Sequence, residues 1–520
     1  MRIWLLALAL LVLPGAARAE WYEASSPNFV VYADDSERDI RRFSEQLERY
    51  HRAMAVVTGN RDLPAPSPSN RVTVFVVKNA REIQRLAGNR FIAGFYIPRA
   101  GGSVAFVPQV QGSSAQRDAT MNTLLHEYAH HFIISNSDFP TPRWLGEGAA
   151  EFFAAARFSS DEGLTIGLPA KDNYLQIAYA DPVEVEELLD PDVYERRKRE
   201  GYDSFYGKSW ALYHYLTFDP ERRGQLTRYI RNMAAGKTSR EAALEAFGSF
   251  TKLDIDLEQY LARRSILSMV FEPGQLEVGR IDLRALSAGE VAMLPARIRS
   301  RRGVDAEEAA EVLVEARQVA ARYQGDAAVL AALAEAEYDA GNDTEAIAAA
   351  DAAIALDPSQ VNAYVQKGYA LFRRAGKADD PVVAYRAAVE PFIALNRLEN
   401  DHPLPLVYYY RSFVERGTRP PEQAVLGLVR AAELAPFDLG LRLSLATHQI
   451  QAGDLASARA NLVPIAYNPH AAGGGAVDGA RRVIERIDAG GEPQSTELLA
   501  LLRSSPPAPA AGEGAAGGGR

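Results

Sequence analysis

The second half of the chain repeats a pattern of small residues every 34 residues, and this interval restricts the fold more than any other feature. The steps from Ala327 to Val361 and from Pro405 to Leu439 are both of this length. Within the first step, the small residues and the closing proline are Ala334, Gly341, Ala346, Ala353 and Pro358. A unit of this size is a pair of helices that buries its apolar face only by stacking on its neighbours. The second half is therefore predicted to be an all-α solenoid.

These offsets resemble the tetratricopeptide repeat. The second copy has Gly368 in the small-residue position and is followed by an insertion, and the helices of Val304–Tyr323 are a degenerate leading repeat. We predict a repeat domain over residues 304–485, preceded by a linker or degenerate repeat over 271–303. A generic alanine-rich helical bundle is the alternative. The resemblance implies a concave surface for a protein partner.

The first half alternates short apolar runs with helical patterns, which predicts a separate α+β domain over residues 20–270. A chain of 520 residues is too long for one core, and about 100 to 200 residues per domain suggests three or so units. The net charge of -10 and the lack of a basic patch argue against nucleic acid as a partner. The expected strands are 28–33, 71–78 and 104–110, and the expected helices are 35–57, 79–86, 114–134, 143–158, 206–215, 221–235 and 239–247.

Both ends of the chain are predicted to lie outside the folded domains. Arg2, the apolar run Trp4–Leu13 and the Ala17-Arg18-Ala19 sequence predict a signal peptide cleaved after Ala19. The run is too short to span a membrane, which takes about 20 apolar residues. We therefore expect a periplasmic or secreted protein, without a membrane segment after cleavage. The chain has no cysteine, which excludes disulfides and a lipid-anchored cysteine. Residues 486–520 are expected to be a disordered tail.

The stretch Thr123–Phe132, TLLHEYAHHF, holds three of the eight histidines of the chain. His126 and His130 are four residues apart, so on a helix they face the same way and can bind one zinc ion. Glu127 lies between them and can act as the general base on a metal-bound water. This is the H-E-x-x-H arrangement, and a catalytic zinc needs a third protein ligand as well.

A second glutamate pair supplies candidates for that ligand. In Arg143–Phe153, RWLGEGAAEFF, the carboxylates of Glu147 and Glu151 are again four residues apart. One of them can bind the metal while the other supports a histidine ligand from behind. Two histidines, one glutamate and a water form the catalytic kind of zinc site, whereas a structural zinc would more often use cysteines.

LLHEYAHHF together with WLGEGAAEFF resembles the gluzincin zinc metallopeptidases, specifically the peptidase MA-like domain found with tetratricopeptide repeats in exported bacterial proteins. NFVVYA and YGKSWALYHYL add weaker likeness, and the resemblance covers roughly residues 20 to 260. It implies a zincin-like fold with Glu147 as the third ligand and Glu151 as the supporting acid. It also implies Tyr206 as the oxyanion donor, with Tyr202 and His214 as substitutes. The spacing from His130 to Glu147 is shorter than in better characterised gluzincins, so a tighter turn is expected.

The remaining histidines are expected to be structural. His131 cannot share the metal-binding face and is predicted to be packed or hydrogen-bonded, and the same holds for His51, His402, His448 and His470. Trp144 and Leu145 are expected in the core.

The function we predict is that of an exported zinc metallopeptidase, in which a metal-activated water attacks the peptide bond and Glu127 takes its proton. The repeats would bind a partner or the substrate, and residues 20 to about 270 would fold and bind zinc alone. The alternative is an envelope scaffold or chaperone-like repeat protein with an inactive or regulatory peptidase-like domain.

Overall fold

A six-stranded sheet organises the first part of the chain. The computed structural model describes residues 21–90, 92–109, 114–137, 141–197, 202–467 and 475–503. The predicted signal peptide therefore lies outside the described residues. The strand order is β4-β5-β3-β2-β1-β9, with β2, β3 and β5 parallel and the other three pairings antiparallel. The strands are β1 (Trp21–Ser25), β2 (Phe29–Asp34), β3 (Val72–Val77), β4 (Phe95–Ile97), β5 (Val104–Pro108) and β9 (Asp282–Ala285).

Helices cover both faces of this sheet, because successive side chains of a strand point to opposite faces. Val74 of β3 packs in the core formed with α1 (Glu37–Val57) and α3 (Ser114–Ser135). Its neighbour Phe75 packs in a second core on the other face. That face is covered by α2 (Ala80–Ala87) and α12 (Ala288–Arg302). The two cores place α3, which carries the histidine stretch, directly on the sheet.

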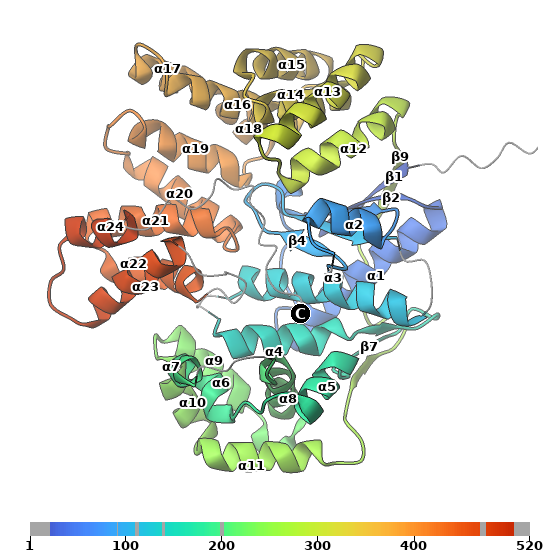
Figure 1. Ribbon diagram of the computed structural model, residues 1–520, viewed down its shortest axis with the longest axis vertical. Helices are drawn as coiled ribbons and strands as arrows, with labels where there is room; N and C mark the ends of the chain where they lie inside the picture. The colour runs from blue at the N-terminus through green and yellow to red at the C-terminus, as the bar shows by residue number, and fades with distance from the viewer. Residues whose placement is uncertain are drawn as a thin grey trace, which may run out of the picture.

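A layer of helices lies below α3 in Figure 1, centred on α4 (Arg143–Ala154) and α8 (Phe205–Phe218). Helix α4 ends earlier than the expected 143–158, because residues 157–158 form strand β6 of a small sheet with β7 (Leu164–Ile166) and β8 (Met269–Phe271). Around α8 lie α5 (Lys171–Tyr179), α6 (Val185–Leu189), α7 (Pro191–Arg196), α9 (Gln225–Ala234), α10 (Ser239–Phe247) and α11 (Phe250–Leu261).

Residues 271–303, expected to be a linker or a degenerate leading repeat, contain a strand of the sheet and a helix that packs on the next helix, so a linker does not describe them. Strand β9 pairs with β1, so Asp282–Ala285 form the edge of the sheet. Helix α12 follows it and has two buried sides. Leu294 and Ile298 pack on the sheet, whereas Met293 packs against the next helix. The turn-rich sequence of this segment therefore connects two regions that share a helix.

The rest of the chain is a run of paired helices that continues to α24, and we call residues 288–503 the helical region. Helices α14 and α16 begin at Ala327 and Val361, in agreement with the 34-residue interval. Part of the expected tail is also helical, since α24 lies within 486–520; residues 504–520 are outside the described part. The helices are α13 (Ala306–Arg322), α14 (Ala327–Asp339), α15 (Asp343–Leu356), α16 (Val361–Ala375), α17 (Pro381–Ala388), α18 (Glu390–Leu398), α19 (Pro403–Val414), α20 (Glu422–Leu434), α21 (Leu439–Ala452), α22 (Leu455–Ala466), α23 (Gly475–Asp488) and α24 (Ser495–Arg503).

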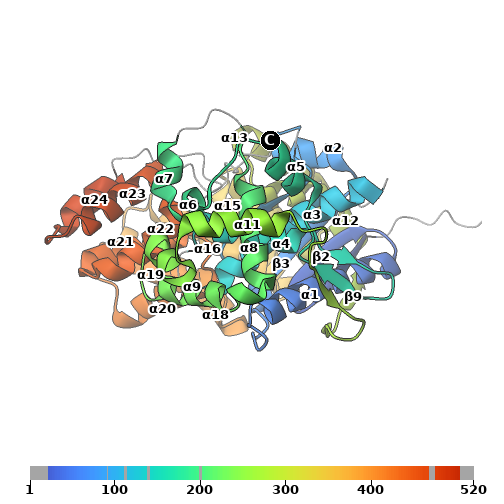
Figure 2. The same cartoon turned by 90° about the horizontal axis from the view of Figure 1, so that it is seen from below.

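The helical region curves over the sheet and returns to α3 and α4 (Figure 1). Seen from below, α19–α24 lie on one side of α4 and α8, and α1, β2 and β9 lie on the other (Figure 2). The turn between β4 and β5, residues 98–103, contacts the inner side of this curve: the Ala100 N–H donates to Asp438 Oδ2 over 2.9 Å. The Ser69 hydroxyl donates to Glu399 over 2.6 Å. The two parts of the chain are therefore docked on each other.

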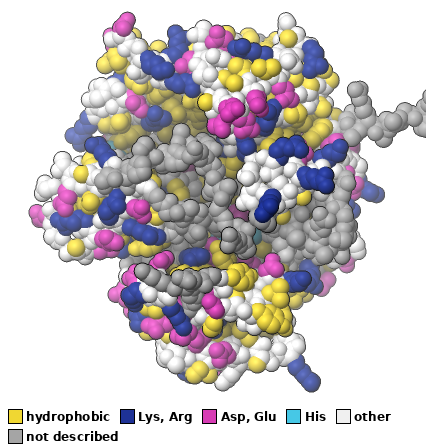
Figure 3. Space-filling view, in the orientation of Figure 1, with side chains coloured by type: hydrophobic (Ala, Val, Ile, Leu, Met, Phe, Trp, Pro, Cys, Tyr) yellow, Lys and Arg dark blue, Asp and Glu magenta, His cyan; other side chains and the backbone are white. Residues whose placement is uncertain are grey.

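The surface of the protein mixes charges of both signs, as the face in Figure 3 shows. Within the described ranges, none of the helices combines the length and the apolar character that crossing a bilayer requires.

Candidate metal centre

Three side chains from two helices converge at the centre of the protein. His126 and His130 lie one turn apart on α3, and their Nε2 atoms are 3.1 Å apart. Glu147 of α4 is fully buried, and its Oε2 lies 3.5 Å from His126 Nε2 and 3.3 Å from His130 Nε2. The structure thus brings together the three residues that the sequence predicts as metal ligands, and they are a group that could hold a metal ion.

The spacing of these atoms can be tested against the geometry of zinc. Zinc lies about 2.0–2.2 Å from histidine nitrogen and carboxylate oxygen, so the corners of a tetrahedron around it are about 3.3–3.6 Å apart. Two of the observed separations, 3.3 and 3.5 Å, lie in this range, and the distance between the two histidine nitrogens, 3.1 Å, is about 0.2 Å shorter. Two imidazoles and one carboxylate are also a donor set that zinc accepts. The residues present therefore fit zinc in both type and spacing.

A second carboxylate holds the first histidine from behind. Glu151 lies one turn after Glu147 on α4, and its Oε1 is 3.3 Å from His126 Nδ1. A hydrogen bond at Nδ1 fixes the ring so that Nε2 faces the centre of the site. Burial alone would lower the pKa of His126, but the hydrogen bonds to Glu147 and Glu151 outweigh it and raise that pKa well above its usual value. The pocket therefore favours positive charge.

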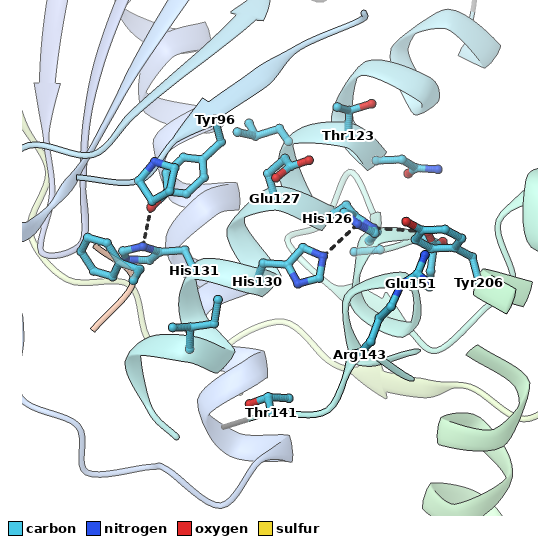
Figure 4. A pocket seen from close by; sticks show the side chains of 18 of the residues that line it. Tyr96, Thr123, His126, Glu127, His130, His131, Thr141, Arg143, Glu151 and Tyr206 are labelled. Carbon is cyan, nitrogen blue, oxygen red and sulfur yellow. Dashed lines mark hydrogen bonds and ion pairs between the residues drawn. The ribbon is translucent and has the colours of Figure 1, made fainter. Parts of the chain in front are cut away.

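Glu127 lies on α3 between the two histidines and is half-buried. Together with His126, His130 and Glu151, it lines a cleft of about 3150 Å³ (Figure 4). A carboxylate at this point can take a proton from a group in the cleft.

Tyr206 is the sequence-predicted donor that the structure places at the site. It lies in the first turn of α8, lines the cleft and lies beside Arg143 and Glu151 (Figure 4). The guanidinium carbon of Arg143 is 5.7 Å from the centre of the Tyr206 ring and 4.2 Å from that of Phe205. Burial raises the pKa of Tyr206 to about 12, so the phenol keeps its proton and can donate it in a hydrogen bond.

Close packing of α4 on α8 explains why a glycine follows the ligand Glu147. A Cβ added at Gly148 would lie 2.4 Å from the backbone oxygen of Ser209. Only glycine allows this approach. The contact ties the helix that carries Glu147 to the helix that carries Tyr206.

The two substitutes for Tyr206 are less well placed. The prediction of His214 as a substitute donor is wrong, because the residue is fully buried in the core. Its Nε2 donates to the Leu267 carbonyl, and its Nδ1 accepts from the Tyr260 hydroxyl. Both of its ring nitrogens are therefore used away from the cleft. Tyr202 lines the cleft, but it is 55% exposed.

The other described histidines have packing or hydrogen-bonding roles, as the sequence predicts. His131 Nδ1 lies 2.6 Å from the Tyr96 hydroxyl, and its ring is 4.6 Å from that of Phe437. His51 and His448 pair with tyrosine hydroxyls, and His402 caps α19. Trp144 and Leu145 are in the core. His470 and the turn 138–140 are outside the described residues.

Sequence reasoning missed two features of this site. The first is Arg143, which packs against Tyr206 and Phe205. Its position at the start of the RWLGEG segment is the signal that could have identified it as part of the site. Phe437 comes from the helical region, more than 300 residues after His131. No local pattern in the sequence points to that contact.

Comparisons with known proteins give limited further information. Residues 120–239 match a family described as a protein of unknown function (DUF1570). No curated protein matches the chain. Among solved structures, the chain is similar to TTC0263, a thermophilic TPR protein in Thermus thermophilus, at 16% identity over 34% of this chain and 88% of that one. The TM-score is 0.29, so this likeness carries no argument about the fold. The family match covers less than half of the chain and includes Tyr206 and the histidines and glutamates of the site: His126, Glu127, His130, Glu147 and Glu151.

Proposed function

We propose that this protein is a zinc-dependent peptidase with a zincin-like catalytic region. The observation that carries the proposal is the convergence of His126, His130 and Glu147 at zinc spacing, with Glu127 beside them on the wall of a large cleft. Bound there, zinc would supply Lewis-acid polarisation of a carbonyl group and would lower the pKa of water toward neutrality.

The residues of the chain have distinct roles in this proposal. Glu127 accepts the proton of the attacking water and passes it to the leaving amine. The Tyr206 hydroxyl donates a hydrogen bond to the oxyanion that develops on the carbonyl oxygen. Arg143 packs against Tyr206 and Phe205 and so limits the movement of the phenol. Glu151 keeps the His126 ring in its orientation.

The position of β4 supports a peptide as the substrate. β4 lies at an edge of the sheet, and its residues Phe95 and Tyr96 line the same cleft as Glu127. An edge strand can pair its backbone with an extended chain, which gives affinity for peptides of many sequences. The helical region would hold a protein partner or part of the substrate.

Metal content provides the first test. Purified mature protein is expected to contain one zinc per chain, measured by mass spectrometry of the metal, and His126→Ala and Glu147→Ala are expected to lose it. His448→Ala is the matched control, because His448 pairs with Tyr410 and lies outside the cleft lining. Full zinc occupancy in His126→Ala would exclude this site.

Turnover provides the second test. Glu127→Gln keeps the fold and the zinc but should lower cleavage of an unfolded protein by about 10²- to 10⁴-fold, since an amide cannot accept the proton. Glu195→Gln is the control, because Glu195 also lines the cleft and is exposed. If Glu127→Gln cleaved as fast as wild type, the peptidase proposal would be wrong. Zinc binding without cleavage in wild type would favour the scaffold alternative.

A further inference from the structure

One wall of the cleft comes from the helical region. Its lining residues on α21, α22 and the segments beside them include Phe437, Leu439, Arg442, Val463, Pro464 and Tyr467. The wall and the metal ligands line one cleft, which includes Phe437 as well as His126 and His130. The Phe437 ring lies 4.6 Å from the ring of His131, so the wall contacts α3. A peptide in this cleft therefore has access to both the metal centre and this wall.

The wall is positively charged, although the whole chain has a net charge of -10. Its charged lining residues are Arg442, Arg459, Arg481 and Asp488, which is three positive charges and one negative charge, or a net +2. Arg459 forms an ion pair with Asp488 through two hydrogen bonds of 2.7 and 2.8 Å. The Arg481 guanidinium donates to the Ala466 carbonyl.

Arg442 differs from these two because it is half-buried and its hydrogen-bond partners are neutral. Its guanidinium donates to the Pro436 carbonyl and, over 3.4 Å, to the side-chain oxygen of Asn461. Within the described part of the chain, no carboxylate forms an ion pair with it. Burial lowers the pKa of Arg442. A desolvated cation without a counter-ion is costly, and an anion in the cleft would offset that cost.

We propose that Arg442 binds a carboxylate of the peptide substrate, so that the helical region selects acidic segments for the metal centre. This inference rests on the proposed function. The cleft wall that carries Arg442 also has apolar lining residues, Leu439 and Val463, and a charge pair is stronger where water is partly excluded. A guanidinium binds carboxylates through two parallel hydrogen bonds. Arg442 and Glu127 line one cleft, so a single bound chain can carry both the selected carboxylate and the bond to be cut.

The carboxylate has two possible sources, an Asp or Glu side chain and the C-terminus of the peptide. Four peptides separate them: one sequence with Glu or with Gln, each made as the free acid and as the C-terminal amide, and each carrying an uncharged fluorophore. Binding is measured by fluorescence anisotropy on the full-length, zinc-loaded Glu127→Gln chain, so that no peptide is consumed. A side-chain site prefers both Glu peptides, and a C-terminal site prefers both free acids.

Arg442→Gln in this background is expected to weaken the preferred pair by about 10- to 100-fold, the loss of one hydrogen-bonded ion pair. It should leave the Gln amide peptide unchanged. Arg442→Lys keeps the charge and should lose only part of the affinity, which guards against a folding defect. Arg386→Gln is the control, because Arg386 is exposed on α17 and outside the cleft lining.

Equal affinity for all four peptides, or equal weakening of all four by Arg442→Gln, would overturn the inference. The two proposals can fail separately. Arg442-dependent binding by a wild-type chain that cuts no peptide would leave the carboxylate site in place and refute the peptidase. Cleavage by wild type without any dependence on Arg442 would do the reverse.

Discussion

Gly101 lies where the turn between β4 and β5 meets the helical region, and replacing it tests how strongly the two parts are docked. Its φ is +74°, a conformation that residues with a Cβ rarely adopt. A methyl group added there would lie 2.8 Å from Cε1 of His402 and 3.0 Å from Cγ of Leu404. His402 is fully buried and cannot move aside without disturbing its surroundings.

The two costs of Gly101→Ala can be separated with a matched variant. The left-handed backbone costs about 1–2 kcal/mol for alanine, and overpacking against His402 and Leu404 adds about 1–3 kcal/mol. Gly453 has a φ of +80° and open space around its Cα, so Gly453→Ala carries only the backbone cost. We therefore expect Gly101→Ala to lower the free energy of unfolding by about 1–3 kcal/mol more than Gly453→Ala.

Urea unfolding of the full-length chain measures this difference. Hydrogen exchange at residues 98–103 and 399–404 then shows whether the docked surfaces open first, and exchange in both segments should rise in Gly101→Ala alone. Equal destabilisation by the two variants, with unchanged exchange in both segments, would refute the docking described above.

Two further substitutions and one truncation test the packing and the charges of the fold. Gly148→Ala should lower the free energy of unfolding by at least about 1–3 kcal/mol and reduce zinc occupancy, because its Cβ would lie 2.4 Å from the Ser209 backbone oxygen; unchanged thermal stability and metal content would contradict this. Burial and the nearby Glu335 raise the pKa of the Asp339 carboxyl group to about 7, above its usual value of 3.8. The folded chain therefore binds the carboxyl proton more tightly than the unfolded chain does, and its free energy of unfolding falls as pH rises from about 4 to about 7. Asp339→Asn should remove that pH dependence and stabilise the chain by about 1–3 kcal/mol at pH 8, measured by urea unfolding at several pH values; a parallel pH profile in both proteins would count against it. The structure revises the expectation that residues 20–270 fold alone, because this fragment lacks Leu286, Leu294 and Ile298, each worth about 1.5–3 kcal/mol of burial against a total stability of about 5–15 kcal/mol. Residues 20–303 should therefore show more native structure by circular dichroism than residues 20–270, and an equally folded 20–270 fragment would show that α12 is dispensable.

The metal ligands could be predicted because their signal is local. His126 and His130 are four residues apart, as are Glu147 and Glu151. Residues at this spacing lie on the same face of a helix, and this does not depend on the rest of the fold. The 34-residue interval is similarly direct, since one repeat contacts mainly its neighbours. Sequence reasoning therefore predicted both the α+β class of the first part and the helical pairs of the second.

The errors fall where position depends on distant residues. Strand β9, DLRA, is mostly exposed and lacks apolar alternation, so only its pairing with β1 defines it. His214 lies on α8, which is buried on nearly all sides, and so the sequence does not say which of its faces meets the cleft. The docking of residues 98–103 depends on single groups such as Asp438, which no periodic pattern marks.

The pairing of β1 with β9 also determines the order in which the molecule can be completed. One edge of strand β1 stays open until a partner more than 250 residues later in the chain has been made. The second face of the sheet is covered only by α2 until α12 follows. A chain emerging from a ribosome or a translocation channel would expose that edge and that face throughout the synthesis of α1 to α11. Such surfaces invite association with other chains. The interval before residue 302 emerges is therefore when this protein most needs a chaperone.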